Sequence, residues 1–238
     1  MRITFTLARK TREGDVWKRG LLSMIDANDQ FEAGLALHRH RCPSMPLGLR
    51  LGQAALNTLG VSPTGDTALL ALVELGDDHH GTCVADGIQI ITGCTFGKGN
   101  IRKLGWGKLV LTLIDKQTNR AVRVAPKAEV IQAGDKSDFV ANYRKQGVPP
   151  TQIPEEVSRP LIEKILTAPQ AALLTVSAIF EPSYEDAPYE WDLFVCPGCG
   201  EITVESYGRL WGGIRLCIPC ATAQGRRASR TQTPDVQR

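Results

Sequence analysis

The spacing of apolar side chains predicts helices in four parts of the chain. Residues 47–59 show this spacing most clearly, with apolar side chains at every third or fourth position: Leu47, Leu51, Ala54, Ala55 and Leu59. Gly60 and Pro63 follow this segment, which is typical of a helix end, and Pro43 and Pro46 stand at its start, where proline is tolerated. Similar patterns predict helices over residues 83–92, with Gly93 as the stop, and over residues 127–146 and 155–167.

Other segments have the pattern of strands. Residues 66–75 form an apolar run that predicts a buried strand, and residues 173–180 predict another near the end of the body. Residues 108–115 and 121–125 flank a polar turn at residues 117–119, which predicts a hairpin. Because strands and helices are interleaved and no clear parallel β-α-β run is recognisable, the predicted fold class is α+β.

Length and composition indicate a globular protein with one good-sized domain and a small appendage. The chain has 238 residues, of which 42% are hydrophobic and 22% charged. The longest apolar stretch, residues 171–180, is interrupted by Thr175 and Ser177, so we expect no membrane span. The first fifteen residues contain no apolar block of the kind found in secretory signals. We therefore expect a cytoplasmic protein.

The charge of the chain is concentrated at its end. The net charge is +3, and the segment from Ala221 onward contains four arginines and one aspartate, which leaves residues 1–220 neutral. We expect residues 223–238 to be a disordered basic tail, a composition more typical of a solvated tail than of a nucleic-acid arm. The acidic, proline-containing residues 181–192 predict a linker, so the expected domains are residues 1–190 and 191–222.

Four of the seven cysteines form two CxxC pairs near the C-terminus. These pairs are separated by 17 residues, and their members are Cys196, Cys199, Cys217 and Cys220. Each pair makes a tight turn that directs two thiolates at one point, and the intervening segment can form a hairpin that brings the pairs together. Because four cysteines fill a tetrahedral coordination sphere, the spacing predicts a structural zinc site.

A second candidate metal site lies in the body, where His38, His40 and Cys42 alternate with two arginines. In an extended chain the three potential ligands would share one face, whereas on a helix they would diverge. Three such ligands suit Zn or another transition metal and leave a coordination position open for water or substrate. An ordinary buried histidine and cysteine explain the pattern equally well.

The remaining cysteines are Cys83, the first residue of the helix predicted over residues 83–92, and Cys94, two residues beyond its end. If that helix continued to Cys94, the two thiols would lie about 16 Å apart, too far to bind one ion. With Gly93 as the helix stop, either cysteine can approach the His38–Cys42 segment independently. The loop at residues 97–100, Gly-Lys-Gly-Asn, offers backbone amides and Lys98 to an anion, or is a plain glycine-rich turn.

Together these motifs resemble the FmdE family, which takes its name from formylmethanofuran dehydrogenase. The resemblance covers residues 26–222 and is carried by three motifs before the CxxC pairs: His38-x-His40-x-Cys42-Pro43, Leu47-Gly48-x-Arg50-x-Gly52 and Cys83-x-x-Asp86-x-x-Gln89-x-x-Thr92-Gly-Cys94-Thr-x-Gly-Lys-Gly-Asn100. It implies an α+β domain with a metal-binding pocket near the first motif, a treble-clef zinc finger and a homodimer. Gly87 stands where the family usually has alanine.

The resemblance also implies a candidate site in this chain. A second metal ion, of zinc or another transition metal, would be held by His38, His40, Cys42 and Cys83. The residues expected to carry catalysis are Cys42, Cys94, Asp86 and Lys98, with Asn100 also near the mouth of the site. His79 and His80 precede Cys83 and could add ligands, although histidines in such a polar turn are more often solvated.

Three functions remain open. The first is a metal- or thiol-dependent enzyme or enzyme component that acts on a small molecule of one-carbon or related redox metabolism. The second is an accessory protein that delivers or guards a metal ion for a larger redox complex. The third is a zinc-finger module that binds a partner protein or nucleic acid. Between the CxxC pairs, Arg209 and Arg215 are offset by Glu201 and Glu205, so we do not expect nucleic acid as the partner.

Overall fold

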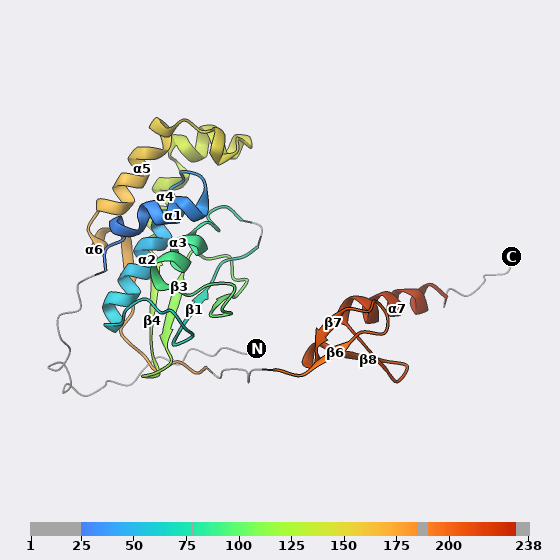
Figure 1. Ribbon diagram of the computed structural model, residues 1–238. Helices are drawn as coiled ribbons and strands as arrows, with labels where there is room; N and C mark the ends of the chain where they lie inside the picture. The colour runs from blue at the N-terminus through green and yellow to red at the C-terminus, as the bar shows by residue number, and fades with distance from the viewer. Residues whose placement is uncertain (1–24, 78, 185–189, 232–238) are drawn as a thin grey trace. The chain divides into compact units, whose positions relative to one another are not determined.

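The computed structural model describes residues 25–77, 79–184 and 190–231 (Figure 1). Its internal contacts divide the chain into two compact units, residues 1–183 and residues 184–238. Among the helices of the described residues, none has the length and apolar character needed to cross a bilayer.

The first unit is built on a five-stranded sheet in the order β2-β1-β3-β4-β5. The strands are β1 (Leu69–Val73), β2 (Ile101–Lys103), β3 (Leu111–Asp115), β4 (Arg120–Pro126) and β5 (Leu174–Val176). The hairpin expected around residues 117–119 is present as β3 and β4, whose antiparallel register pairs Leu113 with Val122. The strand expected over residues 173–180 is reduced to β5 and an isolated bridge between Ala121 and Phe180.

One connection differs from the expectation drawn from the sequence. The strand β1 pairs with β2 in parallel, and α3 (Val84–Thr92) lies between them in the chain, so the fold contains one parallel β-α-β unit. Little in the sequence indicates this unit, because β2 has only three residues and none of them is fully buried. All the other strand pairs of this sheet are antiparallel, so the fold class is mixed α and β as expected.

The remaining helices of this unit are α1 (Phe31–His38), α2 (Ser44–Leu59), α4 (Ala128–Asp135), α5 (Glu155–Thr167) and α6 (Gln170–Leu173). Helix α2 ends where Gly60 takes a left-handed conformation, and α3 ends in the same way at Gly93. The long helix expected over residues 127–146 is instead α4 followed by a π-helical and a 3-10 turn. The break falls at Ser137, whose hydroxyl donates to the Gly134 carbonyl and competes with helical backbone bonding.

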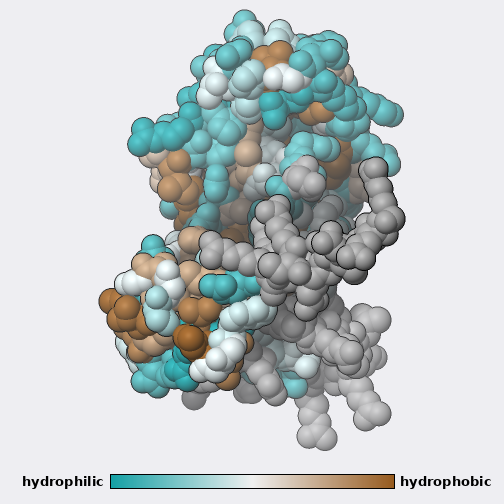
Figure 2. All heavy atoms as spheres, turned by 90° about the vertical axis from the view of Figure 1, so that its right-hand side faces the viewer, coloured by the Kyte–Doolittle hydropathy of each residue, from teal (hydrophilic) through white to brown (hydrophobic). Residues whose placement is uncertain are grey.

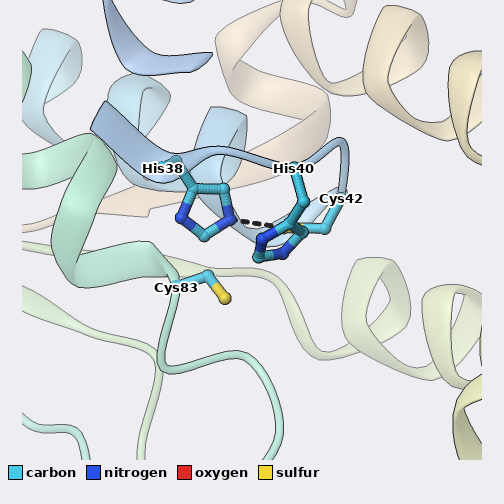
Figure 3. Close-up of side chains that lie close together, drawn as sticks. All are labelled: His38, His40, Cys42 and Cys83. Atoms are coloured by element: carbon cyan, nitrogen blue, oxygen red, sulfur yellow. Dashed lines mark hydrogen bonds between the residues drawn. The ribbon is translucent and has the colours of Figure 1, made fainter. Parts of the chain in front are cut away.

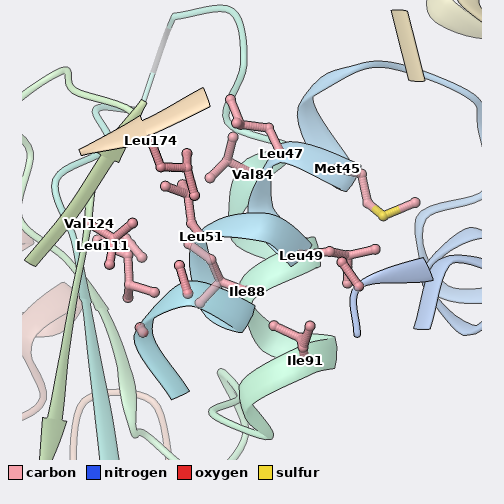
Figure 4. Close-up of a cluster of buried hydrophobic side chains, with 14 of the residues drawn as sticks. Met45, Leu47, Leu49, Leu51, Val84, Ile88, Ile91, Leu111, Val124 and Leu174 are labelled. Atoms are coloured by element: carbon pink, nitrogen blue, oxygen red, sulfur yellow. The ribbon is translucent and has the colours of Figure 1, made fainter. Parts of the chain in front are cut away.

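The core of this unit lies where α2 packs against α3 and the sheet (Figure 4). Leu49 and Leu51 of α2 and Ile88 of α3 are fully buried there. The two helices approach closely because each presents a glycine at the crossing. A Cβ atom built on Gly48 would overlap the Val84 carbonyl, and one built on Gly87 would overlap the Met45 carbonyl.

A buried arginine joins α2 to the end of α5. The guanidinium of Arg50 donates to the carbonyl oxygens of Ile165, Leu166 and Ala168 at distances of 2.6–2.8 Å. These carbonyls belong to the last turn of α5 and its cap, which have no partners within their own helix. Arg50 therefore fixes the end of α5 against α2, the helix that begins two residues after Cys42.

The second unit consists of two short hairpins and a helix. Its elements are β6 (Leu193–Val195), β7 (Ile202–Val204), β8 (Arg209–Trp211), β9 (Ile214–Leu216) and α7 (Ile218–Thr231). Its first CxxC pair lies in the β6–β7 turn and its second at the start of α7, which is the arrangement of a treble clef. Apolar side chains are visible on the surface of this unit in Figure 2.

Helix α7 enters the segment in which a disordered tail was expected, and it runs to Thr231. The alanine, glutamine and arginine residues of this segment have good helix propensity, which explains the difference. Residues 232–238 of the expected tail lie outside the described residues, as do residues 185–189 of the expected linker.

Candidate metal centres

Four side chains from three segments meet at the candidate metal centre of the body. His38 is the last residue of α1, and Cys83 is the cap at the start of α3. Residues 38–42 form neither a strand nor a continuous helix: Arg39 takes a left-handed conformation with φ of 67° and its N–H bonds to the Leu35 carbonyl. The turn at Arg39 and the loop after it, rather than strand alternation, direct His38, His40 and Cys42 to one side.

The donor atoms of this cluster lie close enough to share one ion. The ligand atoms of His38, His40, Cys42 and Cys83 are all within 4.8 Å of one another (Figure 3). Nε2 of His38 lies 3.3 Å from Sγ of Cys42, and the two imidazole rings are 3.9 Å apart between centroids. Nε2 of His40 is buried and has no hydrogen-bond partner within the described part of the chain.

The buried Nε2 of His40, which has no hydrogen-bond partner within the described residues, is evidence that the cluster suits a metal ion. A buried nitrogen without a partner is costly, and a cation bound among the four donors would satisfy it. Two imidazoles and two thiolates are a set of four ligands that is typical of zinc. The residues present therefore fit a metal ion.

The electrostatics of the cluster favour a thiolate before any metal binds. A hydrogen bond from Cys42, helped by the two histidines, lowers the pKa of Cys83 to about 4 despite burial. The hydrogen bond to Cys83 and burial together raise the pKa of Cys42. Burial opposes protonation of His38, but hydrogen bonds to Asp86 and Cys83 raise its pKa to about 9. Cys83 is thus in the thiolate form that binds metals.

Asp86, one of the residues expected to carry catalysis, lies against the ring of His38. Its Oδ2 accepts a hydrogen bond from Nδ1 of His38 at 2.7 Å. This contact fixes the ring so that Nε2 faces the sulfur of Cys42. Carboxylates in this position orient histidine ligands and raise their basicity. The geometry therefore gives Asp86 the features of a positioning residue for the cluster.

The other two residues expected to carry catalysis lie outside the cluster. Cys94 follows the end of α3, a helix whose nine residues span about 14 Å from the Cys83 end. The Cys94 side chain is fully buried. Nζ of Lys98 donates to the Thr64 carbonyl, and the Asn100 side chain bonds to Thr95, Asp66 and Leu69. The structure thus brings neither Lys98 nor Asn100 to the mouth of the cluster.

The histidines before Cys83 also stand apart from it. Nε2 of His79 accepts the backbone N–H of Gly76 at 2.8 Å, and its Nδ1 lies 2.8 Å from the His80 carbonyl. His79 therefore holds its own turn together. His80 lines an apolar pocket formed with α4 and α5.

The second candidate metal centre is in the C-terminal unit. The sulfur atoms of Cys196, Cys199, Cys217 and Cys220 all lie within 4.8 Å of one another. The backbone N–H of Cys217 donates to the sulfur of Cys196, and this bond with those from Gly198 and Cys199 lowers the pKa of Cys196 to about 6. Among the described residues of this unit, the buried apolar cluster consists of Cys196, Leu216 and Cys217.

Comparisons with known proteins agree with this architecture. Residues 37–175 match the family described as "FmdE, Molybdenum formylmethanofuran dehydrogenase operon". A solved FmdE-like protein of Syntrophus aciditrophicus, whose description refers to a tungsten formylmethanofuran dehydrogenase, shares the fold. Its TM-score is 0.56 at 22% identity, over 83% of this chain and 92% of the other.

A curated relative comes from Archaeoglobus fulgidus and is called a probable S-adenosyl-L-methionine-binding protein. It is 29% identical over an alignment of 195 residues that covers 77% of this chain. This chain spans half the length of that relative.

Proposed function

This chain belongs to the FmdE family, and from that membership and the geometry of its two clusters we propose that it is a metal-binding accessory protein. The body cluster would hold a transition-metal ion through His38, His40, Cys42 and Cys83. The four C-terminal cysteines would hold a structural zinc ion. The observation that carries the proposal is the buried, unpartnered Nε2 of His40 among three other donor atoms of the described chain.

The number of donors favours an accessory role over an enzyme. A metal ion held by three protein ligands has a coordination position open for substrate. Here Cys83 joins the ligands of the 38–42 segment as a fourth, which closes that position. A bound metal would be a Lewis acid, but a closed set of four ligands suits holding or passing on an ion. We propose a larger redox complex of one-carbon or related metabolism as the recipient, since the family description refers to a formylmethanofuran dehydrogenase operon.

Metal content measured by plasma mass spectrometry on the full chain tests the proposal. We expect two metals per chain, and one after Cys42→Ala or His40→Ala. Cys94→Ala is the matched control, because this buried cysteine lies outside both clusters, and it should keep both metals. Two metals in the Cys42→Ala and His40→Ala variants would refute the body site. Turnover of a small molecule that depends on Cys42 would refute the accessory role in favour of an enzyme.

The C-terminal unit supports the homodimer that the family resemblance implies. Leu193 and Val195 of β6 and Ile202 of β7 are 59%, 62% and 70% exposed, and the strand register pairs Val195 with Ile202. Exposed apolar faces of this kind mark interaction sites, among them protein–protein contacts. We propose a second copy of this chain as the partner. Light scattering after gel filtration should give a dimer, and Val195→Ser with Ile202→Ser should give a monomer.

A further inference from the structure

The body contains an apolar pocket that is distinct from the metal cluster. Its volume is about 340 Å³, and its walls come from the start of α2, from α4, from α5 and from the segment around α6. Val130 and Ile131 of α4, Leu161 and Ile165 of α5, and Leu47 of α2 are among the apolar side chains that line it. This volume and this lining are typical of small-molecule sites.

No side chain of the described residues fills this pocket. Helix α4 carries apolar residues toward the pocket, yet none of its residues is fully buried. Arg50 fixes the C-terminal end of α5, so the opposite wall cannot simply collapse onto α4. Residues of α4, α5 and α2 line this one pocket, so it lies between the three helices.

The pocket also adjoins the segments that carry two cluster cysteines. Pro43 and Ser44 line it and directly follow Cys42. Gly81 lines it two residues before Cys83. The same two segments therefore separate the pocket from the candidate metal centre.

The charged residues of the lining indicate the chemistry of the ligand. Asp135 is neutralised by Lys145, whose Nζ lies 2.8 Å from its Oδ2. Glu129 of α4 and Lys164 of α5 also line the pocket, and neither side chain makes an ion pair or hydrogen bond within the described residues. Both residues are exposed to solvent while lining the apolar cavity, so one acidic and one basic group are accessible there to a ligand that carries both charges.

We propose that this pocket binds a small zwitterionic molecule with an apolar body, of the class of α-amino acids with a large apolar side chain. The apolar body lies between α4, α5 and Leu47. The ammonium group pairs with Glu129 and the carboxylate with Lys164. This ligand site stands apart from the proposed metal-binding function, since none of the four cluster ligands lines the pocket.

Three molecules with similar apolar bodies test the proposal by isothermal titration calorimetry on the full chain. They are 2-aminooctanoic acid, octanoate and octylamine, at pH 7. We expect 2-aminooctanoic acid to bind about fivefold more tightly than either singly charged molecule, the range of an exposed ion pair. Equal affinities for all three would overturn the proposed head group, and no binding of any would overturn the site.

Substitutions of Lys164 and Glu129 show which side chain binds which charged group of the ligand. Lys164→Gln should weaken 2-aminooctanoic acid and octanoate but not octylamine, and Glu129→Gln should weaken 2-aminooctanoic acid and octylamine but not octanoate. Arg159→Gln removes a charge from α5 outside the lining and should change nothing. Ala133→Phe and Ala172→Phe fill the pocket from opposite walls and should abolish binding, provided circular dichroism shows the native fold. Unchanged binding in both would refute the site.

Discussion

Nδ1 of His38 and Oδ2 of Asp86 lie 2.7 Å apart, although the two residues come from different helices. The contact joins the end of α1 to the first turn of α3 and leaves Nε2 of His38 facing Cys42. A carboxylate behind a histidine ligand fixes the tautomer of the ring as well as its direction. The role of Asp86 thus follows from its partner rather than from access to substrate.

Asp86→Asn should therefore weaken metal binding at the body cluster without removing it. Loss of the carboxylate lowers the basicity of His38, and changes of this type typically reduce metal affinity by about 10- to 100-fold. Competition with a zinc chelator of known affinity measures the effect. Asp77→Asn is the matched control, because Asp77 is an exposed aspartate that pairs with Lys103. Equal affinity in Asp86→Asn and wild type would contradict the positioning role.

Cys217→Ser should unfold the C-terminal unit and leave the body intact. The described part of this unit buries few apolar side chains, so the metal would supply most of its folding free energy. Hydrogen exchange followed by mass spectrometry should show loss of protection over β6 to β9 and unchanged protection in β1 and β3. A chelator should produce the same pattern in the wild-type chain. Retained protection over β6 to β9 in Cys217→Ser would show that the unit folds without its metal.

Gly87→Ala should destabilise the body, because Gly87 lies where α2 and α3 cross. An added Cβ would overlap the Met45 carbonyl, so α2 and α3 would have to separate, and overpacking of this kind costs typically about 1–3 kcal/mol. Chemical denaturation measures the change in the free energy of unfolding. Gly97→Ala is the control, since nothing among the described residues lies within 4 Å of a Cβ built there. An unchanged stability of Gly87→Ala would mean that the helices adjust freely at this crossing.

Local patterns in the sequence predict the elements that form the centre of the fold. Helical spacing together with Gly60 and Gly93 predicts the ends of α2 and α3, because a left-handed glycine stops a helix wherever it occurs. Alternation around residues 117–119 predicts the hairpin of β3 and β4. The β1-β2 pairing is not predicted, because three residues carry too little pattern to identify a strand.

The sequence predicts which residues form the candidate site but not how their side chains are arranged in space. All four donors of the body cluster can be named from the sequence, yet their geometry depends on the turn at Arg39 and on the start of α3. The place of Asp86 behind His38 depends on the packing of α1 against α3, which no local pattern reports. The pocket lined by Glu129 and Lys164 is not predicted for the same reason, since its walls come from separate helices.

Cys94 provides a prediction about pH that is independent of the metal ligands. Burial raises the pKa of this thiol above its ordinary value near 9. Above pH 9 the unfolded chain loses the Cys94 proton while the folded chain keeps it, so folding binds an extra proton and stability falls as the pH rises. The expected slope is up to about 1.4 kcal/mol per pH unit until the pKa of the folded state is reached.

Urea denaturation of the wild type and of Cys94→Ala between pH 8 and pH 10.5 isolates this contribution, because the other cysteines are common to both proteins. Cys94→Ala should be less stable at pH 8, since it leaves a small cavity, but its stability should fall less steeply above pH 9. Parallel pH profiles for the two proteins would mean that Cys94 ionises as readily in the folded state as in the unfolded state. A Cys94 thiol that ionised so readily would form the thiolate that the expected catalytic role requires.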